Sequence, residues 1–273
     1  MRLGLISSAW LGSSVATDEG IRMTKEIGFD CIDIFADPMD IDIRERRLIK
    51  DTCREVGIPV VATVCCALGI ADFNRPVRRF HVERFKRYLE LAYELEGKNT
   101  LLVLGEYIWQ QEVIAARDQW KWAVETVAEL GDYAKGLGVD VAIELEPFHL
   151  SIINTLGKMM TFLDDVHHPA VRANLDISHL ALAHTPAEDI SNLQGRIAHV
   201  HFSDCDGKKH GDLPPGRGVV NFRPYLAQLK KAGFDGVISI ELEYSPEPEK
   251  IVEWVGEAYR ETDKLMQEIG IRG

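Results

Sequence analysis

Four short apolar runs in the second half of the chain each end in a side chain that metal ions favour. The four residues are three carboxylates and one imidazole, namely Glu144, Asp176, His201 and Glu241. This mixed oxygen and nitrogen ligand set suits a divalent ion such as Mn²⁺, Mg²⁺, Co²⁺ or Zn²⁺. A lone glutamate at a strand end is usually a solvated rim residue. Four such residues at the ends of four consecutive parallel strands would meet at one edge of a sheet and indicate a site.

Two of these strand ends carry a second glutamate, which gives the pairs Glu144/Glu146 and Glu241/Glu243. Residues i and i+2 of a strand face the same side, so both members of each pair can point inward. Burying two bare carboxylates together is unfavourable unless a cation compensates them, which again favours a metal. The spacing leaves open which glutamate of each pair is the ligand.

Histidines follow two of the same strands. His179 follows Asp176 by three residues. We expect it to lie above the sheet, as a further ligand or as a donor to the substrate. His199 and His201 face the same way along their strand. Because His201 is nearer the strand end, we expect it to be the ligand and His199 to be a supporting or core histidine.

A long polar loop, residues 203–218, is expected to lie over this edge of the sheet. Loops on a rigid scaffold commonly carry recognition. The loop contains His210 and Arg217, and the planar guanidinium of Arg217 suits a substrate hydroxyl, carboxylate or phosphate. Glu106 and Trp109 follow another candidate strand and are expected to form a wall of the pocket.

One pattern recurs along the chain: an amphipathic stretch, a glycine, and then a short hydrophobic run. It appears around Gly28, Gly57, Gly138 and Gly233. Glycine just past a helix accepts the left-handed conformation that ends it, and strands alternating with helices indicate a parallel sheet. The pattern predicts eight strands, at residues 3–7, 31–35, 60–64, 101–104, 141–146, 171–176, 197–202 and 237–243.

Helical patterns fill the gaps, notably at residues 77–96, 113–135, 156–166, 222–231 and 251–269. In the first of these, the apolar spacing predicts a buried face formed by Phe80, Val82, Phe85, Leu89 and Ala92.

At 273 residues, the chain has the length of one (β/α)₈ barrel or of two small domains. Since no Ser-, Gly- or Pro-rich linker divides it, we expect one TIM-barrel domain over residues 1–273. An open, doubly wound sheet is the alternative, but the chain lacks a G-x-G-x-x-G turn and a Walker-type loop. In a TIM barrel the active site lies at the C-terminal ends of the strands, where the four candidate ligands are expected.

Charge and composition narrow the partners. A net charge of −12 disfavours nucleic acid as a partner. No run approaches the roughly 20 apolar residues of a membrane span. The amino-terminal residues read as a strand rather than as a signal peptide. Five cysteines, mostly in apolar runs, predict reduced thiols and a cytoplasmic location. A homodimer or homotetramer is left open.

The motifs at residues 143–147, 174–179, 199–204, 214–218 and 236–241 resemble those of the xylose-isomerase-like TIM-barrel superfamily. This superfamily of sugar and sugar-phosphate isomerases and epimerases includes tagatose 3-epimerase-type enzymes, inosose dehydratase and endonuclease IV. The resemblance implies that one divalent metal ion (Mn, Co, Mg or Zn) is bound by Glu144, Asp176, His201 and Glu241. It also implies a small-molecule sugar substrate that His179 and Arg217 contact. We expect further substrate contacts from Glu146, His210 and Glu106.

The expected activity is isomerisation or epimerisation of a ketose through a cis-enediolate, with Glu144 and Glu241 as the acid and base. One glutamate removes the proton beside the carbonyl, and the other returns a proton to the opposite face or to the adjacent carbon. Positioned acid and base groups typically contribute about 10²–10⁴-fold in rate. The sparse basic residues near the loop favour a substrate without phosphate.

Three alternatives remain. A dehydratase of a cyclic polyol ketone, of the inosose or dehydroshikimate type, would use the same enolate and expel a β-hydroxyl. An endonuclease IV-like phosphodiesterase would need further histidine ligands and a basic groove, which the charge and the single histidine of the first half, His81, disfavour. A sugar-binding barrel without activity would not require both Glu144 and Glu241.

Overall fold

The computed structural model describes residues 1–66, 68–109, 113–243 and 245–272. Its strands form one closed parallel barrel in which each strand pairs with the next along the chain and β8 pairs with β1. The expectation of a (β/α)₈ barrel is confirmed, and the open-sheet alternative is wrong. The strands are β1 (Arg2–Ile6), β2 (Cys31–Ile34), β3 (Val60–Cys65), β4 (Asn99–Leu102), β5 (Asp140–Glu144), β6 (Val171–Asp176), β7 (Ile197–Phe202) and β8 (Val237–Ile240).

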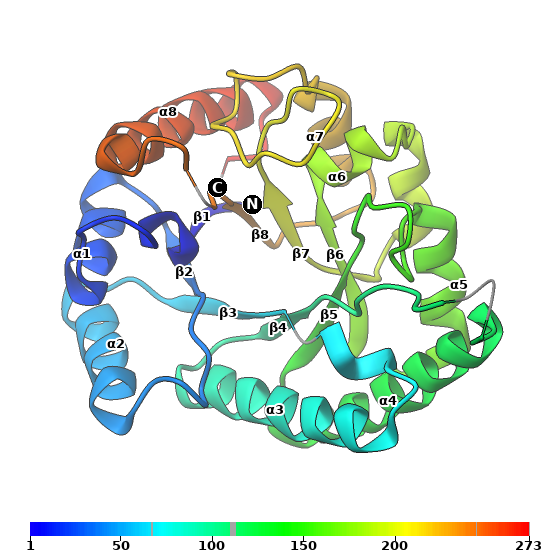
Figure 1. The fold of residues 1–273 in the computed structure, drawn as a ribbon. Helices are drawn as coiled ribbons and strands as arrows, with labels where there is room; N and C mark the ends of the chain where they lie inside the picture. The colour runs from blue at the N-terminus through cyan, green and yellow to red at the C-terminus, as the bar shows by residue number, and fades with distance from the viewer. Residues whose placement is uncertain (67, 110–112, 244, 273) are drawn as a thin grey trace.

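Helices surround the barrel (Figure 1). The predicted bounds of α5, α7 and α8 agree with the structure. Short 3₁₀ helices follow β1 and precede α3, α8 and β7. The α-helices are α1 (Thr17–Ile27), α2 (Ile43–Val56), α3 (Arg75–Glu94), α4 (Ala116–Leu137), α5 (Leu156–Val166), α6 (Ile177–Leu182), α7 (Phe222–Lys231) and α8 (Ile251–Ile269), and the 3₁₀ helices are η1 (Ser7–Trp10), η2 (Leu68–Ala71), η3 (Ala187–Leu193) and η4 (Pro248–Lys250).

Glycines end several of these helices as the sequence pattern predicts. Gly57 after α2 and Gly138 after α4 adopt left-handed φ angles of 68° and 70°. A side chain with a β-carbon is strained in this conformation, so glycine allows the chain to leave the helix and enter the next strand.

Five strands end earlier than predicted, β1 and β2 by one residue and three others by two or three. β4 ends at Leu102, β5 at Glu144 and β8 at Ile240. Glu146 and Glu243 therefore lie in the loops beyond β5 and β8. Beyond a strand, side chains no longer alternate between its two faces. The expectation that both glutamates of each pair face the same side, based on the i, i+2 spacing, therefore does not apply to Glu146 and Glu243.

The main core lies between the barrel and its helices. Within α3, Val82, Phe85, Leu89 and Ala92 are buried as predicted, but Phe80 is 53% exposed. At about 100° per residue, Phe80 lies about 140° around the helix from Phe85 and so faces outward. The placement of Phe80 in the buried face was wrong. Among the described residues, no helix has the length and apolarity that crossing a membrane requires.

Replacing Phe85 should test this core. Phe85 is fully buried, so Phe85→Ala should lower the free energy of unfolding by about 3–5 kcal/mol. Phe80→Ala, on the same helix but exposed, should change it by less than about 1 kcal/mol. Urea denaturation followed by circular dichroism measures both. Equal losses in the two variants would contradict the assigned orientation of α3.

Candidate active site

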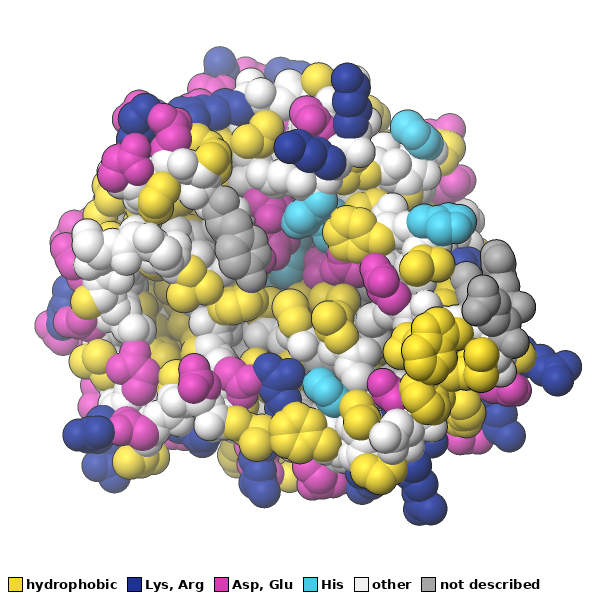
Figure 2. Space-filling model, in the orientation of Figure 1, with side chains coloured by type: hydrophobic (Ala, Val, Ile, Leu, Met, Phe, Trp, Pro, Cys, Tyr) yellow, Lys and Arg dark blue, Asp and Glu magenta, His cyan; other side chains and the backbone are white. Residues whose placement is uncertain are grey.

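The four candidate ligands gather at the C-terminal mouth of the barrel. Glu144 and Asp176 are the last residues of β5 and β6, His201 is the penultimate residue of β7, and Glu241 follows β8. All four are buried. Figure 2 shows acidic and histidine side chains at the bottom of a hollow in this face. The closed barrel thus brings the four predicted residues together.

The donor atoms of these residues surround a common point. One ligand-type atom from each of the four lies within 4.8 Å of the others. His201 Nδ1 is 3.1 Å from both Glu144 Oε1 and Glu241 Oε2, but neither contact is aligned as a hydrogen bond. Two ligands held at about 2.1 Å from one ion, at tetrahedral or octahedral angles, lie about 3.0–3.4 Å apart. The spacing is therefore that of neighbouring metal ligands.

Several of these buried atoms have no hydrogen-bond partner among the described residues. They are Asp176 Oδ2, Glu241 Oε2 and both ring nitrogens of His201. Buried polar atoms are rarely left unpaired without a bound ion or water. The set therefore has the donors, the spacing and the unused lone pairs to hold one divalent cation.

The electrostatics of the cluster indicate a shortage of positive charge. Burial raises the pKa of Glu241 well above its usual range, against the opposing effect of His201, and Glu144 adds to the rise. Burial alone would lower the pKa of His201, but Glu241 and Glu144 raise it well above its usual range. A cation at this point would stabilise the ionised carboxylates in place of protons.

Two of the carboxylates are held by neighbours. Asn174, two residues before Asp176 on β6, donates from Nδ2 to Glu144 Oε1 at 2.8 Å. Asp176 Oδ1 accepts the backbone N–H of His179 at 2.9 Å and caps the start of α6. Asn174 was missed from the sequence, although its i, i+2 relation to Asp176 places both on the inner face.

His179 lies beside the ligand cluster and is buried. Its Nδ1 contacts the carbonyl oxygen of Leu145 at 2.7 Å, and its Nε2 contacts His210 Nδ1 at 2.8 Å. His210 Nε2 lies 3.0 Å from Asp212 Oδ2. The two predicted histidines thus form a chain that ends on a carboxylate, and Asp212 is a member that sequence reasoning missed.

Counting the hydrogens in this chain gives its charge. The Leu145 carbonyl and an ionised Asp212 only accept, so His179 Nδ1 and His210 Nε2 each carry a hydrogen. The bond between the rings needs a third hydrogen. Three hydrogens on four nitrogens give the pair one positive charge. Consistently, Asp176 and Glu146 outweigh the effect of burial and raise the pKa of His179 to about 10.

Glu146 and Glu243 line the mouth outside the ligand group. Burial raises the pKa of Glu146 to about 7, with a contribution from Glu144 against the opposing charge of His179. Burial and then Asp212 raise the pKa of Glu243 to about 6. The structure therefore brings Glu144 and Glu241, rather than their second glutamates, into the four-residue group.

The loop after β7 is ordered by one carboxylate. Asp204 accepts the backbone N–H groups of Gly216, Gly218 and Val220 at 2.9–3.0 Å. Arg217 lies between these anchor points, but its Nε donates to Glu257 Oε1 at 2.9 Å and its guanidinium stacks 4.5 Å from the centre of the Trp254 ring. Among the described residues, these contacts tie Arg217 to α8 and not to the ligand cluster.

Glu106 lies on the rim of the mouth. It is exposed, and its backbone forms a bridge with Ser151 in the loop after β5. Trp109 is also exposed and contacts Phe73 with 5.8 Å between ring centres. The structure does not bring Glu106 together with the four candidate ligands.

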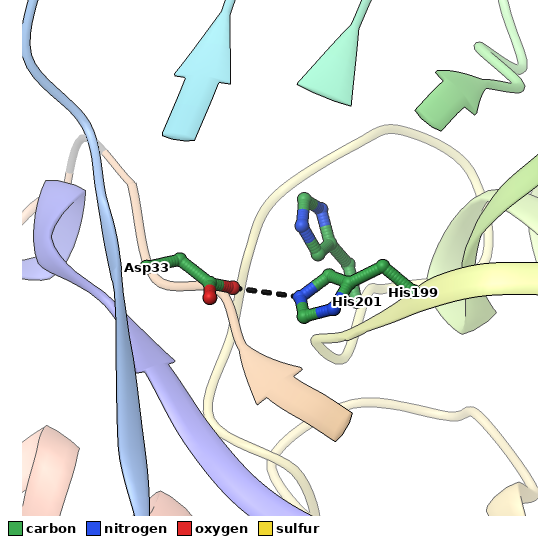
Figure 3. Close-up of side chains that lie close together, drawn as sticks. All are labelled: Asp33, His199 and His201. Atoms are coloured by element: carbon green, nitrogen blue, oxygen red, sulfur yellow. Dashed lines mark hydrogen bonds and ion pairs between the residues drawn. The ribbon is translucent and has the colours of Figure 1, made fainter. Parts of the chain in front are cut away.

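A second buried pair lies at the same mouth. Asp33, near the end of β2, contacts His199 Nε2 through Oδ2 at 2.7 Å (Figure 3). The expectation that His199 supports the site or fills the core agrees with this burial. Asp33 was missed, because nothing in its local sequence links it to a residue 166 positions away.

Comparison with known proteins places the chain among epimerases and isomerases. The family model described as xylose isomerase-like TIM barrel matches residues 21–262. An uncharacterised protein of Methanocaldococcus jannaschii is 30% identical over 180 residues, which cover 64% of this chain and 60%, less than two thirds, of that protein. L-ribulose 3-epimerase of Mesorhizobium japonicum is 25% identical over 88% of this chain and 80% of its own.

Solved structures agree on the fold. The IOLI protein, solved with a bound zinc atom, superposes with a TM-score of 0.84 at 21% identity, and the match covers 98% of this chain and 99% of that one. The match to the family model extends from within α1 to within α8. The chain therefore belongs to the xylose isomerase-like TIM-barrel family, and it is an enzyme of the isomerase and epimerase type.

Proposed function

We propose that this enzyme is a divalent-metal-dependent sugar epimerase or isomerase that acts on a ketose through a cis-enediolate. The observation that carries the proposal is the group of four buried donors within 4.8 Å at the barrel mouth. The names of the epimerase relatives support the reaction class, and the zinc atom of the IOLI structure supports a metal. The five free cysteines support a cytoplasmic location.

Glu144, Asp176, His201 and Glu241 would hold the ion, whether Mn²⁺, Co²⁺, Mg²⁺ or Zn²⁺. A bound divalent ion supplies Lewis acidity, which makes the carbon beside a ketose carbonyl easier to deprotonate. We assign Glu144 rather than Glu146 to the ligand set, because Glu144 contacts His201 Nδ1 at 3.1 Å whereas Glu146 lies outside the group.

The same glutamates are suited to move the proton. Glu144 and Glu241 come from β5 and β8, which are not neighbours in the barrel, and both contact the same nitrogen of His201. A carboxylate oxygen of one takes the proton from the carbon beside the carbonyl and leaves a cis-enediolate. The other glutamate starts protonated and delivers its proton to the opposite face of that carbon, or to the adjacent carbon, so the two exchange protonation states and no proton is gained or lost overall.

Residues around the ligand cluster would orient the sugar. The positive charge shared by His179 and His210 lies beside Asp176 and Glu146, where it can stabilise negative charge on a substrate oxygen. We propose that Glu146 accepts a sugar hydroxyl. Arg217 and Glu106 would act at the rim, since Arg217 is already held by Glu257. A ketose without phosphate suits the acidic mouth.

Removal of a ligand should abolish tight metal binding. Metal-depleted protein titrated with Mn²⁺ should bind one ion per chain, and Asp176→Asn should weaken the affinity by more than about 100-fold, because it removes a charged donor. His201→Ala should do the same. His168→Ala, in the loop before β6 at the opposite end of the barrel, is the matched control. Unchanged affinity in Asp176→Asn and His201→Ala would contradict this site.

Replacement of either glutamate should block proton exchange. Glu144→Gln and Glu241→Gln should lower the rate of solvent deuterium uptake into a responsive ketose by about 10²–10⁴-fold, measured by NMR. Glu129→Gln, which alters an ion pair with Lys86 on the helical surface, should leave the rate unchanged.

The products separate the rival functions. Deuterium uptake with a new ketose or aldose indicates the proposed activity, whereas loss of water from a cyclic polyol ketone would indicate the dehydratase. Tight sugar binding without exchange would favour an inactive barrel. Several zinc ions per chain with nicking of abasic DNA would overturn the proposal.

A further inference from the structure

The Asp33–His199 pair crosses the interior of the barrel. Asp33 belongs to β2 and His199 to β7, and these strands are separated by β1 and β8. The side chains are 0% and 1% exposed, and their contact is 2.7 Å long. Figure 3 shows the ring of His201 beside this pair. A buried carboxylate is thus placed next to the histidine of the ligand cluster.

Asp33 has an unfilled oxygen. Its Oδ2 accepts from His199, but Oδ1 has no hydrogen-bond partner in the described parts of the chain. A buried carboxylate with one donor is costly, because each oxygen has lost the water that would otherwise solvate it. A further donor is therefore expected within reach of Oδ1.

The Ser239 hydroxyl lies within reach of Asp33, and the His201 ring offers a second donor on the same side. Its Nδ1 faces Glu144 and Glu241, which leaves the Nε2 edge of the ring for the opposite side. With Nδ1 presenting its lone pair to an ion, the single hydrogen of a neutral imidazole lies on Nε2. His201 Nε2 has no partner in the described residues. The ring thus has one unused donor, and Asp33 has one unused acceptor.

The upper limit on the separation leaves room for a single bridging water molecule. Ligand-type atoms of Asp33, His199 and His201 lie within 4.8 Å of one another, and no direct bond joins Asp33 to His201 among the described contacts. A water that makes two hydrogen bonds of about 2.8 Å joins atoms about 4.4–4.8 Å apart. Ser239, opposite His201 in the register of β8, brings another unpaired buried hydroxyl to the same place and can complete the water's bonds.

We propose that Asp33 is a positioning residue that holds the Nε2–H of His201 through one buried water and so aims Nδ1 at the metal. His199 in turn fixes Asp33 through its Nε2–H bond to Oδ2. Carboxylates that orient a metal-binding histidine also increase its basicity, and their loss typically weakens metal affinity by about 10–100-fold. The inference rests on the proposed metal site, but it assigns a positioning role to Asp33 and His199, which are not themselves ligands.

The test is a metal titration of the whole chain with Mn²⁺ alone. Asp33→Asn keeps the shape but leaves one acceptor oxygen for two donors, so the dissociation constant should rise about 10–100-fold. His199→Leu should also weaken binding, whereas His199→Gln, whose amide can replace the Nε2–H, should restore it. Asp140→Asn, which weakens a half-buried ion pair with Arg172 at the opposite end of β5 from the mouth, should leave the affinity unchanged.

A second measurement follows the histidine itself. In Zn²⁺-loaded protein, ¹⁵N NMR should find His201 with hydrogen on Nε2 and slow exchange of that hydrogen in the wild type, and faster exchange in Asp33→Asn. Thermal unfolding of the metal-free variants reports folding separately. The His199 variants test the brace, meaning the hold of Asp33 on His201 Nε2–H, even if Asp33→Asn does not fold.

The outcomes are distinct. Tight one-to-one binding by the wild type that both Asp33→Asn and His199→Leu leave unchanged would overturn the brace and leave the proposed function standing. If the wild type binds two ions per chain and Asp33→Asn loses one of them, a second cation and not a water lies beside Asp33, and this result would overturn the brace. A wild type that binds no ion would overturn the proposed function and the brace together.

Discussion

The structure of this mouth is governed by the cost of burying like charges. Closure of the barrel forces three carboxylates and one imidazole into a space where their donor atoms lie within 4.8 Å of one another. In low dielectric surroundings such a group cannot remain fully ionised without a compensating cation. The raised pKa values of Glu241 and His201 express this conflict. A divalent ion would resolve it and would at the same time supply the acidity that the proposed reaction needs.

The surroundings hold the ligands by hydrogen bonds that come from separate elements. Asn174 of β6 fixes Glu144 of β5, and the backbone at the start of α6 fixes Asp176. In the loop above, Asp204 gathers several backbone N–H groups and keeps the chain near His210 in one arrangement. The partners lie on β6, at the start of α6 and in the loop after β7, so the geometry of the site depends on several elements of the barrel.

Sequence patterns predicted the strands and the gathering of four polar residues at one mouth, because both depend on local alternation and on the shared direction of parallel strands. Patterns did not decide between Glu144 and Glu146, since that choice depends on where β5 ends. They also missed Asp33, whose partner His199 is distant in the chain. The contacts of Arg217 with α8 were not predicted, because they arise from tertiary packing that a motif does not encode.

Asp176 has two roles within one side chain. One oxygen accepts the backbone N–H of His179 in the first turn of α6, and the other has no hydrogen-bond partner among the described residues. A helix cap of this kind contributes about 0.5–2 kcal/mol to folding. Selection for a stable barrel would therefore preserve this aspartate even in a descendant that had lost its substrate. Among homologues, retention of Asp176 alone would be poor evidence of retained catalysis, whereas joint retention with Glu241 would be informative.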